Sequence, residues 1–161
     1  MHSSVFEVSH APVPAEKWAR AGNLPDWFYE QICSYAENIG PEQRQGTISQ
    51  LCGALGSLCT LEGDRLTVSP QIRGIYFRKS YSSFIAAAET LAQTDYEAFS
   101  GCRTDQTLLL ALDKLNGTYE DKRGFYIYLS ETGKLMTLDC WLRTVDLGHE
   151  SQGIYPQSER P

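Results

Sequence analysis

The order in which helix-like and strand-like patterns occur along this chain constrains its fold more than any other feature of the sequence. Several segments repeat apolar residues every three or four positions, as amphipathic helices do, and the strand-like segments are grouped between them. Regular alternation of strands and helices would indicate a parallel, doubly wound sheet, whereas grouped strands indicate hairpins. The sequence therefore predicts an α+β fold, in which about five helices pack on small antiparallel hairpin elements in a single domain.

Proline, glycine and capping residues set the limits of the predicted helices. The predicted helices are residues 14–21, 25–39, 41 to about 56, 80–93 and 104–116, followed by a short helix capped by Asp139. In the segment 104–116, a single arc of about 120° holds Leu108, Leu109, Leu112 and Leu115. The sequence also predicts that Asn116-Gly117 ends this helix.

Strand patterns occur in three places. Residues 3–9 alternate weakly and predict an edge strand, while 59–68 and 125–138 each predict a β-hairpin around a glycine-containing turn. Residues 149–161 are polar and rich in turn residues, so they predict a disordered tail after a domain of residues 1–148.

Size and cysteine usage limit the class of protein. A chain of 161 residues can bury a core without a disulfide or a metal ion to hold it. The five cysteines are odd in number, irregularly spaced and free of any C-x-x-C motif, and residues 1–20 lack the pattern of a secretory signal. Because no stretch approaches about 18 consecutive apolar residues, no membrane span is expected. We therefore expect a cytoplasmic protein.

Few residues are arranged in a pattern that suggests catalysis. The three histidines do not cluster with cysteines or carboxylates, so no metal site and no cofactor is predicted. Cys102 precedes Arg103 and a predicted helix, which are surroundings that favour a reactive thiolate. A thiol enzyme built on Cys102 stays open as an alternative, but without a C-x5-R or G-x-S-x-G motif an unreactive loop cysteine is the favoured interpretation. The expectation is a non-enzymatic protein.

A basic and aromatic segment at 73–81 is the candidate for nucleic-acid binding. Its candidate contacts are Arg73, Arg78, Lys79 and Tyr81. Cations of this kind meet phosphates while an aromatic ring stacks on a base. The net charge of −6 opposes accumulation on a polyanion, so nucleic acid is the less favoured partner.

Acidic residues without neighbouring bases are the broader surface signal. Residues 21–43 contain no Lys or Arg and four acids: Asp26, Glu30, Glu37 and Glu42. On a helix at 25–39, three of these acids would lie within about 40°, opposite Phe28, Ile32, Tyr35 and Ile39. Residues 80–102 also contain three acids and no base. A solvated surface is the simplest interpretation, and a surface that docks a basic protein is the functional one.

These patterns together lead to the hypothesis of a small acidic interaction module that binds and inhibits a basic nucleic-acid-binding protein. In size and charge the chain resembles the small acidic proteins by which phages and mobile elements inhibit nucleases, anti-CRISPR proteins among them. That analogy rests on no motif. The sequence indicates neither the identity of the partner nor the oligomeric state.

Overall fold

The structure is a computed structural model that describes residues 3–32, 35–63, 65–101, 106–119, 124–145, 153–154 and 157–160. The chain separates into two compact units, which we call the sheet unit (residues 1–73 and 123–161) and the helical unit (residues 74–122). The helical unit is inserted in the sequence between strands β4 and β5 of the sheet unit. The structure contains both helices and small sheets, as the sequence predicted.

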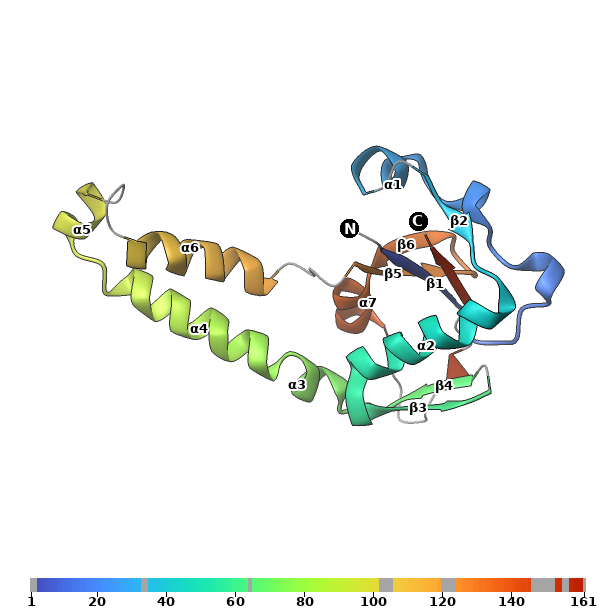
Figure 1. The fold of residues 1–161 in the computed structure, drawn as a ribbon. Helices are drawn as coiled ribbons and strands as arrows, with labels where there is room; N and C mark the ends of the chain where they lie inside the picture. The colour runs from blue at the N-terminus through green and yellow to red at the C-terminus, as the bar shows by residue number, and fades with distance from the viewer. Residues whose placement is uncertain are drawn as a thin grey trace. The chain divides into compact units, whose positions relative to one another are not determined.

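A five-stranded mixed sheet forms the centre of the sheet unit (Figure 1). Its strands, in the order β2-β8-β1-β5-β6, are Glu37–Asn38, Gln157–Arg160, Ser4–Val8, Phe125–Leu129 and Lys134–Thr137. β1 runs parallel to β5 and antiparallel to β8. β1 therefore lies inside the sheet, and the prediction of an edge strand is wrong. Its partner strands β5 and β8 are about 120 and about 150 residues away in sequence, so no local pattern shows the pairing.

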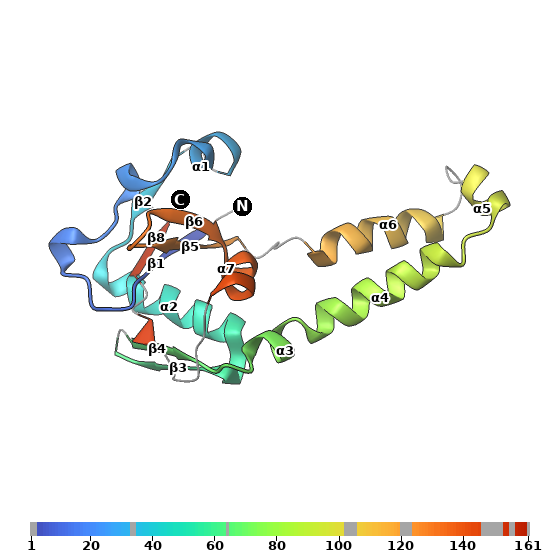
Figure 2. The same cartoon turned by 180° about the vertical axis from the view of Figure 1, so that it is seen from behind.

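Different helices cover the two faces of this sheet, as both views of the ribbon show (Figures 1 and 2). On one face, Val5 packs with Leu24 and with Phe28 of helix α1 (Asp26–Gln31). Side chains alternate along a strand, so Phe6 and Ile127 lie on the other face, where both are fully buried. That face carries α2 (Pro41–Leu55) and α7 (Leu138–Thr144).

A second, three-stranded sheet in the order β3-β4-β7 completes the sheet unit. Its strands are Cys59–Glu62, Arg65–Val68 and Gly153–Ile154. The helix beginning at Pro41 and the hairpin that follows it agree with the sequence prediction. Gly63, with φ of +60°, occupies the turn in a backbone conformation that favours glycine.

The C-terminal segment, predicted as a disordered tail, contains two short strands in its described residues. Residues 153–154 pair with β4, and residues 157–160 pair with β1 and β2. Strand pairing uses backbone N–H and C=O groups, which a polar segment supplies as well as an apolar one. The other residues between 149 and 161 lie outside the described part of the chain.

Of the two helices predicted near the N-terminus, one is shorter than expected and the other is replaced by 3₁₀ turns. The helix predicted at 25–39 ends at Gln31, and residues 37–38 form β2. Pairing of β2 with β8 takes these residues out of any helix, so tertiary structure overrides the local pattern. Tyr35, expected on the buried stripe, is 63% exposed. The helix predicted at 14–21 is replaced by two single 3₁₀ turns, Ala15–Lys17 and Ala21–Asn23.

The short C-terminal helix is present but has a different cap. In α7 the hydroxyl of Thr137 accepts a hydrogen bond from the backbone N–H of Cys140 at 3.2 Å, so Thr137 is the N-cap in place of Asp139.

The helical unit is built on one pair of long helices. Its elements are α4 (Arg78–Ala92), α5 (Tyr96–Ser100) and α6 (Gln106–Tyr119), and α3 (Ile72–Tyr76) bridges the boundary with the sheet unit. α4 and α6 pack side by side along their lengths (Figure 1). α6 continues three residues past the predicted stop at Asn116, since a glycine costs a helix only about 1 kcal/mol. Among the described residues of this unit, the buried apolar side chains are Ala87, Leu108 and Ala111.

Candidate protein-binding groove

Helix α6 carries more apolar side chains than a pair of helices can bury. Leu108 and Ala111 are buried, whereas Leu109 is 46%, Leu110 65% and Leu112 42% exposed. The leucine arc recognised in the sequence is therefore only partly covered in the structure. A helix packed against a single neighbour has one narrow internal face, so an apolar arc of about 120° extends beyond it.

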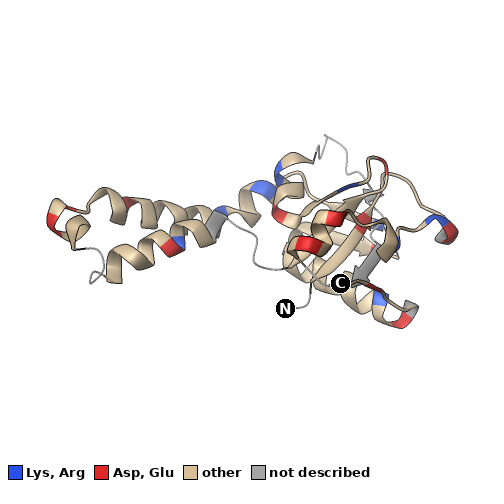
Figure 3. Cartoon of the chain, turned by 90° about the horizontal axis from the view of Figure 1, so that it is seen from above, with Lys and Arg blue, Asp and Glu red and all other residues tan. Residues whose placement is uncertain are grey.

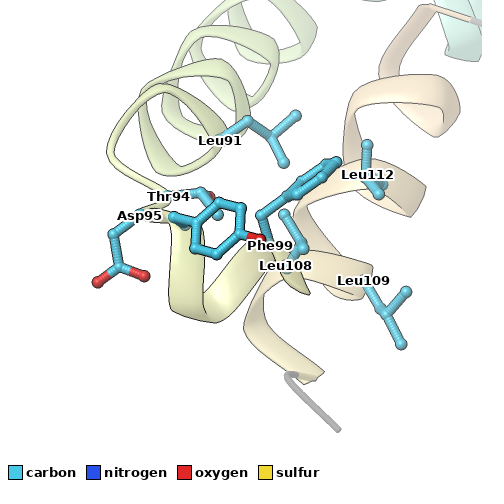
Figure 4. A pocket seen from close by; sticks show the side chains of 8 residues that line it. Leu91, Thr94, Asp95, Phe99, Leu108, Leu109 and Leu112 are labelled. Atoms are coloured by element: carbon cyan, nitrogen blue, oxygen red, sulfur yellow. The ribbon is translucent and has the colours of Figure 1, made fainter. Parts of the chain in front are cut away.

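An apolar groove lies where α4, α5 and α6 meet (Figure 4). Its volume is about 520 Å³, and its lining residues are Leu91, Thr94, Asp95, Tyr96, Phe99, Leu108, Leu109 and Leu112. Figure 4 shows Leu91 of α4 and Leu108 and Leu112 of α6 converging on the aromatic side chains that α5 supplies. Tyr96 and Phe99 are 81% and 68% exposed, so the groove presents open aromatic surface to solvent.

Local hydrogen bonds fix α5 at the end of α4. The backbone N–H of Thr94 donates to the carbonyl of Leu91 at 3.1 Å, and the Asp95 carboxylate accepts from the N–H of Ala98 at 2.8 Å. Asp95 is thus an N-cap, which stabilises a helix by about 1 kcal/mol. The five-residue helix is too short to form by propensity alone, so this cap and the turn before it place Tyr96 and Phe99.

The charged residue that lines the groove, in the part of the chain that the structure describes, is Asp95. Glu97 of α5 and Asp113 of α6 follow the lining residues Tyr96 and Leu112 in the sequence, and we define the acidic rim as these two acids with the N-cap Asp95, all exposed. At about 100° per residue, Asp113 lies about 40° from Leu109 around α6, whereas Lys114 lies about 140° away. Figure 3 shows acidic and no basic ribbon in the described part of α5. The nearest base before Leu91 in the sequence is Lys79, about 18 Å away along the axis of α4.

The acidic residues that the sequence singled out are exposed but do not form one stripe. Asp26 and Glu30 lie on α1, Glu37 lies in β2, and Glu42 lies in the first turn of α2. The stripe assumed a single helix over 25–39, which the structure lacks. A role for these four carboxylates in partner binding stays a prediction.

The structure assigns different surroundings to the members of the basic segment. The Arg73 guanidinium donates from Nε to the carbonyl oxygen of Leu142 at 2.6 Å and also donates to the carbonyl of Val145, so it holds the end of α7. Arg78, Lys79 and Tyr81 are exposed in the first turn of α4. Arg73 therefore has a structural role, whereas the exposed side chains of Arg78, Lys79 and Tyr81 are accessible to a ligand.

The described cysteines are not arranged for nucleophilic chemistry. Cys52 and Cys59 are half-buried free thiols, and Cys140 is an exposed one. Burial raises the pKa of Cys52, and burial together with the neighbouring Cys52 raises the pKa of Cys59 to about 12. Cys33 and Cys102 lie outside the described residues.

Within the residues that the structure describes, no group of three or more His, Cys, Asp or Glu side chains could hold a metal ion. In the same residues, no helix combines the length and the apolar character needed to cross a bilayer.

A polar cleft of about 550 Å³ in the sheet unit contains a buried carboxylate that the sequence did not suggest. Glu7 is 4% exposed, its Oε2 accepts from the N–H of Ala19 at 2.8 Å, and its Oε1 accepts from the Ser130 hydroxyl. Each carboxylate oxygen thus has a partner within the protein. The geometry indicates a structural carboxylate that ties the loop carrying Ala19 to the end of β5. An acid inside an alternating apolar strand is the sequence signal that could have identified it.

Comparisons with protein-family models, with curated proteins and with solved structures find no match for this chain.

Proposed function

We propose that this protein is a non-enzymatic interaction module that binds another protein through the groove formed by α4, α5 and α6. The observation that carries the proposal is the exposure of Tyr96, Phe99 and Leu109 around a groove whose shape is already formed. Burying apolar surface contributes about 25 cal/mol per Å², so leaving these side chains in water forgoes stability in the isolated chain. Clustered apolar exposure of this kind is typical of interaction sites.

The partner we propose is a basic protein that itself binds nucleic acid, and the module would inhibit it by competing with the phosphate backbone. The net charge of −6 supports such a partner, because opposite charge speeds encounter between proteins. The exposed carboxylates of Asp26, Glu30, Glu37 and Glu42 would add long-range attraction to the contacts made in the groove.

Direct binding of nucleic acid is the second candidate, supported by the exposure of Arg78, Lys79 and Tyr81 at the start of α4. Titration with fluorescent single-stranded DNA separates the two proposals. Tight, salt-sensitive binding that falls on changing Arg78 and Lys79 to Gln would favour the nucleic acid.

The test of the proposed function uses two leucines one position apart on α6. Leu109 lines the groove, whereas Leu110 is exposed and lies outside its lining, which makes Leu110→Gln a matched control for Leu109→Gln. Tagged full-length chains would capture proteins from cells that make this protein, with quantitative mass spectrometry as the readout.

Wild type and Leu110→Gln should recover the same partner, and Leu109→Gln should recover at least tenfold less of it. Equal recovery by all three chains, or no partner specific to the wild type, would contradict the proposal. Circular dichroism and the melting temperature would show that both variants are folded.

A further inference from the structure

We infer that the groove binds an amphipathic helix with an apolar face and basic flanks, supplied by a partner protein. This inference rests on the proposed function and names the chemistry of the segment that occupies the site. It follows from the walls of the groove and from the sign of the charge around it.

The walls favour a helix over an extended segment. The groove is bounded by helices, whose backbone N–H and C=O groups bond within the helix and offer no strand edge. An extended peptide lying on Leu91, Phe99 and Leu112 would leave its own backbone groups without partners. A helix satisfies its backbone internally and presents apolar residues at i, i+3, i+4 and i+7 on one face, which is the established way of filling such a groove.

The charge around the groove favours a basic occupant. Asp95, Glu97 and Asp113 form the acidic rim, and the described residues 80–101 and 106–113 contain no Lys or Arg. A helix seated on the apolar floor would place its flanking side chains near this rim. Lys or Arg there would gain favourable interactions, whereas Glu or Asp would be repelled.

The same charge disfavours a second copy of this chain as the occupant. Two copies meeting at this groove would bring two acidic rims together, and each chain carries a net charge of −6. Like charges across an interface oppose association, so self-association through the groove is expected to be weaker than binding of a basic helix.

The probes for this inference are three labelled peptides of about 18 residues that share one length. The first has Leu at helical spacing and Lys on the remaining face, the second replaces every Lys with Glu, and the third is a scrambled version of the Leu/Lys peptide. Fluorescence anisotropy with the full chain at two ionic strengths gives the affinities.

The Leu/Lys peptide should bind at least tenfold more tightly than either of the others. Leu109→Gln should weaken its binding at least fivefold, and Leu110→Gln should leave it within twofold. The double variant Glu97→Gln/Asp113→Asn, which keeps the Asp95 cap, should weaken it about threefold and reduce its salt dependence.

Equal binding of the Leu/Glu or the scrambled peptide, or binding that ignores Leu109→Gln, would overturn the inference. Analytical ultracentrifugation tests the remaining occupant, a second copy of this chain. A wild-type dimer that Leu109→Gln abolishes would identify the second copy as the occupant and would also overturn the inference. If the Leu/Lys peptide fails while capture of a protein still depends on Leu109, the proposed function stands and only the chemistry assigned to the occupant is wrong.

Discussion

The two units of this protein use their apolar side chains in opposite ways. Among the described residues, all but three of the buried apolar side chains belong to the sheet unit. All but two of the large exposed apolar side chains belong to the helical unit. A sheet with helices on both faces encloses a core, whereas a pair of helices has only one internal face to bury. The apolar residues of the sheet unit therefore form a core, whereas those around the groove are exposed and are the ones that the proposed function assigns to contact with another molecule.

Two phenylalanines provide the strongest test of this difference. Phe6 is fully buried in β1, so Phe6→Ala should cost about 3–5 kcal/mol of unfolding free energy. Phe99 is largely exposed in α5, and Phe99→Ala should cost about 0.5 kcal/mol or less. Urea unfolding of both variants gives the two values. Comparable losses would mean that Phe99 is a core residue and that the contrast between the units is wrong.

Glu7 tests whether the polar cleft of the sheet unit is structural. Glu7→Ala leaves the N–H of Ala19 and the hydroxyl of Ser130 without their acceptor, which should cost roughly 1–3 kcal/mol. Glu16 is exposed and lines the same cleft, so Glu16→Ala should change stability by about 0.5 kcal/mol or less. Thermal melts of both variants compare them. A stable Glu7→Ala chain would remove the carboxylate from the structural framework.

The local features of this fold could be predicted from the sequence, and the non-local ones could not. Gly63 and Gly133 lie in hairpin turns at positive φ. The strand patterns on either side of each glycine predict both hairpins. In contrast, β1 pairs in parallel with β5, and residues 37–38 pair with β8. Both pairings depend on segments that are distant in the sequence. No spacing within either strand encodes such a partner.

The groove was missed for a related reason. The leucine spacing on α6 showed that an apolar face exists, but it did not show how much of that face a neighbouring helix would cover. Tyr96 and Phe99 carried a signal that could have been used, since two aromatic residues follow the capping residue Asp95 in a segment too short to bury them.

Cys59 and Cys140 should differ in how fast their thiols react. The pKa of Cys59 is raised to about 12, so at pH 8 almost none of it is thiolate, the form that alkylating reagents attack. Exposed Cys140 should therefore be labelled by iodoacetamide at least tenfold faster than Cys59, as residue-resolved mass spectrometry would measure.

The sign of the pH effect follows from the direction of the shift. Because the folded-state pKa of Cys59 lies above the ordinary thiol value of 9.0, this thiol contributes stability that is complete below about pH 9 and is lost as the pH rises toward 12. Labelling of Cys59 as fast as Cys140 at pH 8 would show that Cys59 is not shielded.

Hydrogen–deuterium exchange of the full chain, alone and with its captured partner, tests the central claim most directly. Binding in the groove should slow amide exchange in α5, in the last turn of α4 and in the first turns of α6, and should leave β1 and β5 unchanged. Protection confined to the sheet unit, with exchange around Phe99 and Leu109 unaltered, would contradict the assignment of the groove as the binding surface.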